Sequence, residues 1–585
     1  MSNDNQYAEG LTIFSSFFDY YSAAIDKDGN EVWNSGNSNI VYYSNDGYGN
    51  LFGSKYVEEN EYNLPGIQFS IDSEEIWIEP NDSFLHHDFF KLPNGNYMGL
   101  TEFRQSGQIP ENIPFNILQT FSFFPTYPSC GGGSGCFVFP WAGDKIIEWE
   151  SDTKNVVWEW STFDYLDYLQ DYDVIGGSWS INTLQDGVYD WTHCNALTYD
   201  SNNDKLYLSS RNLSRIIKID KATKEIDWQI GFGMPSDEVD CGLDLNFSFQ
   251  HSIQILENGN ILIFDNGNIS QLLDDSLDYP TSRALEINVE ETDSGCNASI
   301  VWEYRLSEDL FGNVSGNTAK LNNGNYLITT IGEGGTSLEV NNLGEIVWRG
   351  NYNLTLPAGL VYRAHRIKGL YPVAFSVTAN NYSYVDELGH VYPFETIDDG
   401  NGMISIETSA RFKIWNNGDL EEVFEYQWFE ENGNLGITSP VQSITISPGN
   451  YYEVTGIYAI GDEFSLRVTP RHRPELEKII SMTVVNSQTL SNETISLPSN
   501  YKLKTPYPNP FNPSVNIEYF APSNSFIELK IYNMTGTLIK TLESKHIIAG
   551  NHSTIWNAKD IASGNYIVEL NADNFKQTKK ITLIK

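Results

Sequence analysis

Residues 256–265 read Leu256-Glu257-Asn258-Gly259-Asn260-Ile261-Leu262-Ile263-Phe264-Asp265, a turn sequence followed directly by an apolar strand. Asn-Gly favours the type I′ turn that joins two antiparallel strands, so this stretch predicts a β-hairpin. The same Leu-x-Asn-Gly-Asn pattern occurs at Leu92-Pro93-Asn94-Gly95-Asn96 and at Leu321-Asn322-Asn323-Gly324-Asn325. A hairpin that recurs along the chain indicates a repeat architecture.

A second hairpin unit alternates with the first and ends in a tryptophan. One copy runs from Ile216-Ile217-Lys218-Ile219-Asp220 to Asp227-Trp228, and the others end at Trp33, Trp158, Trp302 and Trp348. Two alternating hairpins make a four-stranded antiparallel blade, and radial repetition of blades makes a β-propeller. The tryptophan series predicts five to seven blades between about residue 8 and residue 372, with an array of β-sandwiches as the alternative.

The composition agrees with an all-β chain and limits its partners. The 585 residues are 14% aromatic and only 19% charged, with 46 Gly, which disfavours coiled coils and helical bundles. The net charge of −42 predicts no nucleic-acid partner, and no apolar run approaches the ~20 residues of a membrane-spanning helix. The polar start lacks the features of a signal peptide, so we expect either a cytosolic protein or a signal removed from this chain.

The repeat stops after Tyr371-Pro372. Alternating strands over residues 375–490 predict a β-sandwich of immunoglobulin-like size. A polar linker then leads to residues 500–585, where ten Lys against six Asp and Glu give a net charge of +4. We therefore expect three domains: a propeller at 8–372, a sandwich at 375–490 and a second small sandwich at 500–585.

The tail opens on Tyr507-Pro508-Asn509-Pro510-Phe511-Asn512-Pro513 and continues with Ile531-Tyr532-Asn533, Gly536 and Ser563-Gly564-Asn565-Tyr566. These motifs resemble the C-terminal sorting domain of proteins exported by the type IX secretion system of Bacteroidetes-like bacteria. The resemblance covers residues 501–585. It implies the type IX secretion machinery as a partner and a secreted or cell-surface location in a Gram-negative cell. It also implies a signal peptide, which is not present in this chain.

The five cysteines do not show the spacing of a zinc ribbon. Cys130 and Cys136 bracket Gly-Gly-Gly-Ser-Gly, so they form either a small disulfide in an oxidising compartment or two free thiols. The odd number leaves at least one thiol unpaired or intermolecular.

Three histidines occupy equivalent places in the repeat. His87 stands eight residues before Gly95, His251 stands eight before Gly259, and His193 precedes the strand Leu206-Tyr207-Leu208 in the same way. Because the first strand of a propeller blade lines the central channel, we expect the three imidazoles to converge at one channel mouth.

Three further residues extend this set of candidates. Arg211 follows the next strand, at the step that Asn266 occupies in the following blade, so it joins the same ring. Arg363 and His365 lie near the end of the predicted propeller and are additional candidates.

Three histidines and an arginine allow more than one interpretation. Neutral imidazoles suit zinc or copper, with Asp88 as the nearest carboxylate along the chain. Alternatively, the arginine grips an anion while one histidine attacks phosphorus or sulfur. In the third interpretation each histidine only packs and hydrogen-bonds within its own blade.

Several further motifs stand out: Gly10-Leu11-Thr12-Ile13-Phe14, His86-His87-Asp88-Phe89, Asp190-Trp191-Thr192-His193-Cys194-Asn195, Ser209-Ser210-Arg211-Asn212-Leu213-Ser214, Gln250-His251 and Phe264-Asp265-Asn266-Gly267. Together they resemble the bacterial arylsulfotransferase (aryl-sulfate sulfotransferase) family over residues 8–370. The resemblance implies a six-bladed propeller that transfers a sulfuryl group from an aryl sulfate donor to a phenolic acceptor. It implies a sulfohistidine intermediate, with neither a nucleotide sulfate donor nor a cofactor or metal.

The resemblance also implies roles for individual residues. His251 becomes the nucleophile, while Arg211, His87 and His193 bind the sulfuryl oxygens and one histidine protonates the leaving phenolate. Asn195 helps to orient the site. His86 competes with His87 for its role, and the repeat register favours His87. Arg363 and His365 remain further substrate-binding candidates.

Two other functions stay open from the sequence. The propeller could be a non-catalytic cell-surface module that binds anionic or aromatic ligands, or a sulfate-ester hydrolase in which water takes the group from His251. One feature departs from the family, whose periplasmic members often carry a small disulfide shortly before the nucleophile. In this chain Cys241 is the only cysteine in that stretch.

Overall fold

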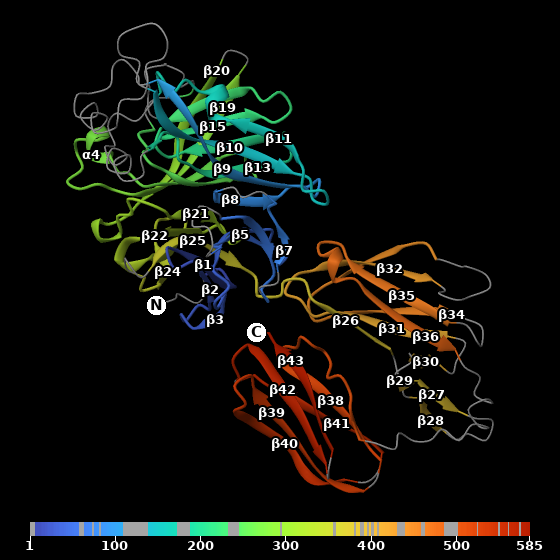
Figure 1. The fold of residues 1–585 in the computed structure, drawn as a ribbon. Coiled ribbons are helices and arrows are strands. Elements are labelled where there is room, and N and C mark those ends of the chain that lie inside the picture. The colour runs from blue at the N-terminus through green and yellow to red at the C-terminus, as the bar shows by residue number, and fades with distance from the viewer. Residues whose placement is uncertain are drawn as a thin grey trace. The chain divides into compact units, whose positions relative to one another are not determined.

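The computed structural model describes residues 6–57, 64–72, 75–80, 84–108, 138–171, 188–231, 241, 245–292, 295–354, 359–379, 382–385, 391–394, 397–398, 403–405, 409–429, 439–457, 463–484, 501–522, 524–547, 550–559, 561–572 and 575–584. These residues form an all-β structure with many antiparallel sheets (Figure 1). The chain divides into two compact units, one of residues 1–46 and 50–367 and the other of residues 47–49 and 368–585.

The first unit contains six sheets in the part of the chain that is described. Five have four strands each, in the orders β25-β1-β2-β3, β4-β5-β6-β7, β13-β14-β15-β16, β17-β18-β19-β20 and β21-β22-β23-β24. The sixth has the order β11-β10-β9-β8, with the short β12 added in parallel to β10. We number them sheets 1 to 6 by their place along the chain, so that sheet 1 holds β1 and sheet 3 holds β8.

The strand bounds in sheets 1 to 3 are Leu11–Phe17 (β1), Tyr21–Ile25 (β2), Glu31–Asn34 (β3), Leu360–Ile367 (β25), Ile40–Asn45 (β4), Leu51–Lys55 (β5), Gly66–Phe69 (β6), Glu75–Ile78 (β7), Leu85–Lys91 (β8), Tyr97–Gln108 (β9), Val138–Trp149 (β10), Val156–Ser161 (β11) and Tyr189–Asp190 (β12). Those in sheets 4 to 6 are Cys194–Asp200 (β13), Lys205–Ser210 (β14), Arg215–Asp220 (β15), Ile226–Gly231 (β16), His251–Ile255 (β17), Ile261–Asp265 (β18), Arg283–Thr292 (β19), Gly295–Arg305 (β20), Asn317–Lys320 (β21), Tyr326–Thr330 (β22), Thr336–Val340 (β23) and Ile346–Asn351 (β24). The described connections contain two short α-helices, Thr162–Tyr165 (α2) and Ser270–Leu273 (α4).

The Asn-Gly hairpins form where the sequence predicts them, but with a different turn. Between β17 and β18 the amide of Gly259 donates to the carbonyl of Leu256, and the amide of Leu256 donates to Asn260. Gly259 has a φ of +83°, whereas Asn258 keeps a negative φ. A type I′ turn needs positive φ at both central residues, so the expectation of type I′ is wrong. The loop is a type I turn closed by a left-handed glycine, the usual form for slightly longer hairpin loops.

One edge strand of each sheet contacts the corresponding edge strand of the next sheet; in sheet 1 this edge strand is β25. In the order β4, β8, β13, β17 and β21 each strand touches its successor, and β25 touches both β21 and β4. We call these six the inner strands. Sheet 1 joins the two ends of the unit, because β25 pairs with β1 through partners such as Leu11 with Ile367 and Ile13 with His365.

The tryptophans at the other edge of the sheets link each sheet to its neighbour. The indole N–H groups of Trp77, Trp158 and Trp348 donate to the carbonyls of Ser151, Lys221 and Lys27, at 2.8, 2.9 and 3.0 Å. These bonds join sheet 2 to sheet 3, sheet 3 to sheet 4, and sheet 6 back to sheet 1. Buried apolar clusters lie between neighbouring sheets in the same way, such as the one that packs Leu92 and Trp141 of sheet 3 against Leu197 and Ile217 of sheet 4.

A disulfide joins Cys241 to Cys296, with their Cα atoms 4.9 Å apart and a sequence separation of 55. Cys194 is a buried free thiol. Sequence reasoning did not foresee this pairing. Cys130 and Cys136 lie outside the described residues.

In the second unit, residues 375–484 and 502–583 have separate apolar cores, one around Phe412 and Leu466 and the other around Ile517 and Val568. The first set contains Phe375–Ala379 (β26), Tyr382–Val385 (β27), Val391–Phe394 (β28), Ile397–Asp398 (β29), Met403–Ser405 (β30), Ser409–Asn416 (β31), Glu422–Phe429 (β32), Gln442–Ile446 (β33), Tyr451–Ile457 (β34), Glu463–Pro470 (β35) and Lys478–Val484 (β36). The second contains Lys502–Leu503 (β37), Ser514–Ala521 (β38), Ser525–Asn533 (β39), Leu538–Ile547 (β40), Gly550–Asn557 (β41), Gly564–Ala572 (β42) and Phe575–Leu583 (β43).

The sheet orders are β26-β31-β34, β27-β28 and β29-β30-β36-β35-β32-β33 in the first set, and β37-β38-β41 and β40-β39-β42-β43 in the second. Within the described residues, no helix is long and apolar enough to span a membrane.

Candidate active site

The three predicted histidines lie at irregular starts of inner strands. The pairing of β8 with β9 shifts register between Leu85 and Phe89, and His87 in that interval has a φ of +66°. His193, just before β13, has a φ of +44°, and Ser252, beside His251, has a φ of +63°. Such backbone is uncommon for residues other than glycine and often marks functional sites.

These irregular starts bring the three imidazoles together. Nε2 of His87 lies 3.2 Å from Nε2 of His193. The ring centres of His87 and His251 are 6.5 Å apart. The His87 ring is therefore close to both other rings, and we call the three residues the histidine cluster.

His251 is buried and held through Nδ1. This nitrogen lies 2.7 Å from Oδ1 of Asn266, at the end of β18. The amide nitrogen of Asn266 donates to the carbonyls of Gly312 and Ser315, at 2.7 and 3.0 Å, so the oxygen faces the imidazole. His251 must then carry its proton on Nδ1, which leaves the lone pair on Nε2. Burial and the charge of Arg211 lower the pKa of His251 well below its usual value, so the ring is neutral near pH 7.

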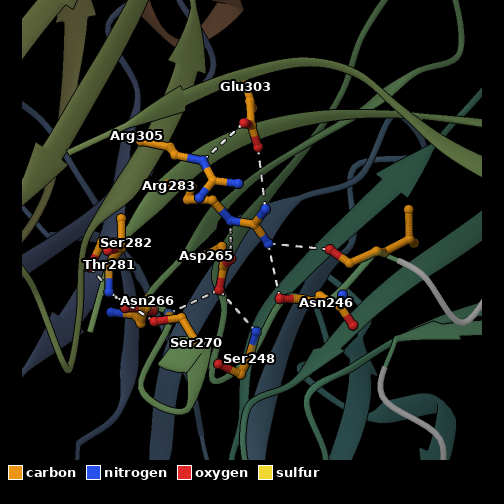
Figure 2. A network of polar contacts seen from close by, with 12 residues as sticks. Asn246, Ser248, Asp265, Asn266, Ser270, Thr281, Ser282, Arg283, Glu303 and Arg305 are labelled. Atoms are coloured by element: carbon orange, nitrogen blue, oxygen red, sulfur yellow. Dashed lines mark hydrogen bonds and ion pairs between the residues drawn. The ribbon is translucent and has the colours of Figure 1, made fainter. Parts of the chain in front are cut away.

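A polar network fixes the two segments that bring His251 and Asn266 into contact (Figure 2). Asp265 accepts hydrogen bonds from the amides of Ser248 and Gly267, both at 2.9 Å, and from Nε of Arg283 at 2.8 Å. Arg283 also donates to the carbonyl of Asn246 at 2.9 Å. The segment before His251 and the loop that carries Asn266 are therefore tied to one carboxylate.

Arg211 reaches the cluster from the end of β14. Its backbone N–H donates to the carbonyl of His193 at 3.2 Å, and its guanidinium lies over the ring of Phe249 at 4.8 Å. Nη1 donates to Asn212 at 2.8 Å. The guanidinium is the fixed positive charge that most affects His251.

The remaining two histidines are joined in a chain of hydrogen bonds. Nδ1 of His193 lies 2.5 Å from Oδ2 of Asp190, and Nδ1 of His87 lies 2.8 Å from the hydroxyl of Tyr362. The His193 side chain is 35% exposed, so solvent reaches it. Burial and the nearby positive groups lower the pKa of His87 well below its usual value, so this ring stays neutral.

The His86 ring lies beside the cluster, with its centre 4.9 Å from that of His87 and 6.4 Å from that of His193, but His86 and Asn195 hydrogen-bond to other partners. Nε2 of His86 lies 3.0 Å from Asp144. Burial lowers the pKa of His86, but the hydrogen bond and charge of Asp144 outweigh it and raise the pKa overall. Asn195 donates through its amide to the carbonyl of Gln250 at 2.7 Å, which fixes the residue next to His251.

Arg363 and His365 lie on β25 and are engaged elsewhere. Arg363 is paired with Asp88 through contacts of 2.5 and 3.2 Å and also donates to the carbonyl of Asn195 at 2.8 Å. His365 hydrogen-bonds to the hydroxyl of Tyr42 at 3.1 Å. The structure thus brings Arg211 to the histidine cluster, whereas His365 contacts Tyr42 of β4 instead.

The described residues hold no group of three or more His, Cys, Asp or Glu side chains that could bind a metal ion. Asp88, the carboxylate considered for a metal site, accepts hydrogen bonds from Arg363 and from the amide of Leu197 instead.

Comparison with known proteins assigns two parts of the chain. Residues 140–351 match the Arylsulfotransferase (ASST) family, and residues 505–585 match the Secretion system C-terminal sorting domain. The first match contains His193, Arg211, His251 and Asn266, which gives this part of the chain an arylsulfotransferase-type function in the broad sense. The second indicates secretion or display at the cell surface.

No curated protein matches the chain. Among solved structures, a protein of unknown function from Bacteroides caccae is 12% identical, with a TM-score of 0.33, over 61% of this chain and 99% of its own. PorZ, a surface component of the type-IX secretion system of Porphyromonas gingivalis, is 12% identical, with a TM-score of 0.22, over 97% of this chain and 68% of its own.

Sequence reasoning did not identify three residues that contact the histidine cluster. Asn266 marked the repeat register and belongs to the quoted Phe264-Asp265-Asn266-Gly267 motif, but no role was predicted for its side chain. Asp190 opens the quoted motif that contains His193, and Tyr362 directly precedes Arg363, but no role was predicted for either, and only the structure pairs them with His193 and His87.

Proposed function

We propose that this protein is an aryl-sulfate sulfotransferase that works through a sulfohistidine at His251. The observation that carries the proposal is the contact between His251 and Asn266, which leaves Nε2 as a neutral nucleophile beside the charge of Arg211. The match of residues 140–351 to the arylsulfotransferase family supports the class of reaction.

The scaffold in this proposal is a six-bladed β-propeller over residues 8–372. Two features support it: the cyclic contacts of the inner strands, and the tryptophan bonds that return from sheet 6 to sheet 1. Pairing of β25 with β1 then closes the ring with strands from both ends. A sandwich at 375–490 and a sorting domain at 500–585 complete the domain assignment.

In the first half-reaction, Nε2 of His251 attacks the sulfur of a bound aryl sulfate. The N–S bond forms as the bond between sulfur and the aryl oxygen breaks, and the phenolate leaves with the electron pair. Arg211 offsets the negative charge on the sulfuryl oxygens, and the neutral His87 donates to them through a ring N–H.

We assign the protonation of the leaving phenolate to His193. His87 is a poor acid because its pKa is lowered well below the usual value, whereas His193 is solvent-accessible and paired with Asp190. In the second half-reaction the acceptor phenol attacks the same sulfur. The N–S bond breaks, its electron pair returns to Nε2, and His193 takes up the phenol proton.

The test is a burst experiment with 4-nitrophenyl sulfate as the donor. Without an acceptor, the wild-type protein should release about one nitrophenol per enzyme and then stop, because the sulfohistidine accumulates. Added phenol should restore turnover. His251→Asn should remove burst and turnover together, while the control His546→Asn, on exposed β40, should retain both.

Each alternative function has its own outcome. Steady release that ignores added phenol would identify a hydrolase, and no release from the wild type would leave a binding protein. A fully active His251→Asn variant would overturn the mechanism.

A further inference from the structure

One carboxylate oxygen of Asp144, on β10, holds the chain on both sides of His193. Oδ2 accepts a hydrogen bond from the hydroxyl of Thr192 at 2.5 Å and another from the backbone N–H of Cys194 at 2.7 Å. Thr192 and Cys194 are the residues directly before and after His193. The φ of His193 is +44°, and such backbone persists only where the surrounding structure holds it in place. The two hydrogen bonds to Oδ2 provide that restraint.

The other oxygen of Asp144 acts on the stretch that carries His87. Oδ1 lies 3.0 Å from Nε2 of His86, which directly precedes His87 in the chain. His87 also has a positive φ, of +66°, and the pairing of β8 with β9 is irregular there. The contact of His86 therefore ties β8 to β10 at the point where the backbone ladder is interrupted.

Asp144 is itself fixed and buried. Its backbone N–H donates to Oγ1 of Thr162 at 3.0 Å, and its carbonyl accepts from the same hydroxyl at 3.2 Å. The residue is only 3% exposed. Burial raises the pKa of Asp144, but the hydrogen bonds from His86 and Thr192 outweigh it and lower the pKa overall. The side chain is therefore an ionised carboxylate, which can accept all of these hydrogen bonds at once.

We propose that Asp144 is a positioning residue for sulfuryl transfer, whose two oxygens hold His193 and His87 so that their Nε2 atoms lie 3.2 Å apart. The inference rests on the proposed function, in which His193 protonates the leaving phenolate and His87 binds the sulfuryl oxygens. Asp144 acts in this role through the chain beside the two rings and does not touch the substrate.

Two substitutions separate placement of the rings from the charge of the carboxylate. Asp144→Asn keeps an oxygen for Thr192 and Cys194, and its amide can donate to Nε2 of a neutral His86. Asp144→Ala removes every one of these contacts and leaves buried donors unpaired. The alanine variant should therefore displace His193, whereas the asparagine variant should keep it in place.

The test compares burst rates with phenyl sulfate and 4-nitrophenyl sulfate as donors. Asp144→Ala should slow transfer from phenyl sulfate at least about tenfold more than transfer from 4-nitrophenyl sulfate, because a displaced His193 no longer protonates the more basic phenolate. Asp144→Asn should keep the wild-type ratio of the two rates. The matched control is Glu286→Ala, which removes a buried carboxylate of β19 that accepts from Asn260 and Tyr326 at 2.6 and 2.7 Å. It should also keep the wild-type ratio.

A second measurement does not depend on turnover. Hydrogen exchange of the backbone amide of Cys194, followed by mass spectrometry, should lose its protection in Asp144→Ala and keep it in Glu286→Ala. Should Asp144→Ala not fold, Thr192→Val removes only one of the hydrogen bonds and should change the donor ratio in the same direction. Should the wild type give no burst, the proposed function fails, and exchange of this amide alone decides whether Asp144 holds the segment.

Four results would overturn the proposal. They are a wild-type donor ratio in Asp144→Ala, the same change of the ratio in Asp144→Asn as in the alanine variant, an equal change in Glu286→Ala, and full protection of the Cys194 amide in Asp144→Ala.

Discussion

Oδ1 of Asn266 lies 2.7 Å from Nδ1 of His251, while the amide nitrogen of Asn266 is committed to two backbone carbonyls. The amide can therefore not turn round, and the imidazole has only one tautomer compatible with it. This relationship converts a buried histidine into a nucleophile whose lone pair is on a defined nitrogen.

We predict that Asn266→Leu lowers kcat by at least about 100-fold, because the ring loses the acceptor that selects its tautomer. Asn266→Asp keeps an acceptor oxygen and should retain more activity than the leucine variant. Steady-state kinetics with 4-nitrophenyl sulfate and phenol measure both, and the leucine variant should change kcat more than KM. Equal activity of the two variants would contradict the tautomer argument.

The pH dependence should reflect the lowered pKa of His251. The reactive form is the neutral ring, so kcat/KM should stay high at neutral pH and fall only as the pH drops through that depressed pKa, well below 6.5. Arg211→Gln removes one cause of the lowered pKa of His251, so the fall of kcat/KM at acidic pH should move toward neutral pH.

The same variant should also lose about 2–4 kcal/mol of transition-state stabilisation, because a fixed charge on the sulfuryl oxygens is gone. Profiles of kcat/KM from pH 4 to 9 for both proteins make the comparison. An acidic fall at the same pH in the wild type and the variant would show that Arg211 does not act on His251.

Local sequence signals predicted much of the first unit. Asn-Gly turns and tryptophan-ended hairpins mark the strands, because turn chemistry and alternating burial act over a few residues. Sheet 2, from β4 to β7, carries no Asn-Gly motif of this kind, and its tryptophan, Trp77, was not part of the predicted series and is placed only by the structure. The pairing of β25 with β1 joins the two ends of the unit, and no local pattern specifies it.

The site was predictable to the level of the strand on which each residue lies. Register placed His87, His193 and His251 at matching strand starts, and the structure brings them together. Side-chain direction was not predictable, because it depends on positive φ at His87 and His193. The sequence also could not distinguish Arg211, whose charge acts on His251, from Arg363, which Asp88 binds, because the pairing with Asp88 is a contact between residues 275 positions apart.

The Cys241–Cys296 disulfide should contribute measurably to stability. Closing a loop of this length restricts the unfolded chain and is worth about 2–4 kcal/mol. Cys241→Ser should therefore lower the melting temperature, and reductant should lower that of the wild type but not that of the variant. Cys194→Ser, at the buried free thiol, is the control that should keep its sensitivity to reductant. A melting temperature unaffected by Cys241→Ser would contradict this role.

The sorting domain should be dispensable for catalysis. Residues 502–583 have their own apolar core, so a chain of residues 1–495 should fold and retain full turnover when purified. In the producing cell the same deletion should prevent delivery to the surface, because the segment that matches the sorting domain is gone. Assays of purified protein and of the cell-surface fraction measure the two effects. Loss of turnover in the purified truncated protein would show that the domains depend on one another.

The contact of 2.5 Å between Asp190 and His193 predicts a dependence on the leaving group. In the proposed mechanism the carboxylate accepts the Nδ1 proton and orients the ring, which leaves Nε2 to protonate the departing oxygen. Phenolate is a strong base and needs a proton as it leaves, whereas 4-nitrophenolate leaves without much help. Asp190→Ala should therefore slow transfer from phenyl sulfate at least about tenfold more than transfer from 4-nitrophenyl sulfate, within the range of general acid catalysis. Burst rates for the two donors give this ratio directly, and Asp28→Ala, in an exposed turn, should leave it at the wild-type value. If Asp190→Ala slows both donors equally, His193 is not the acid, and Asp190 only supports the fold around it.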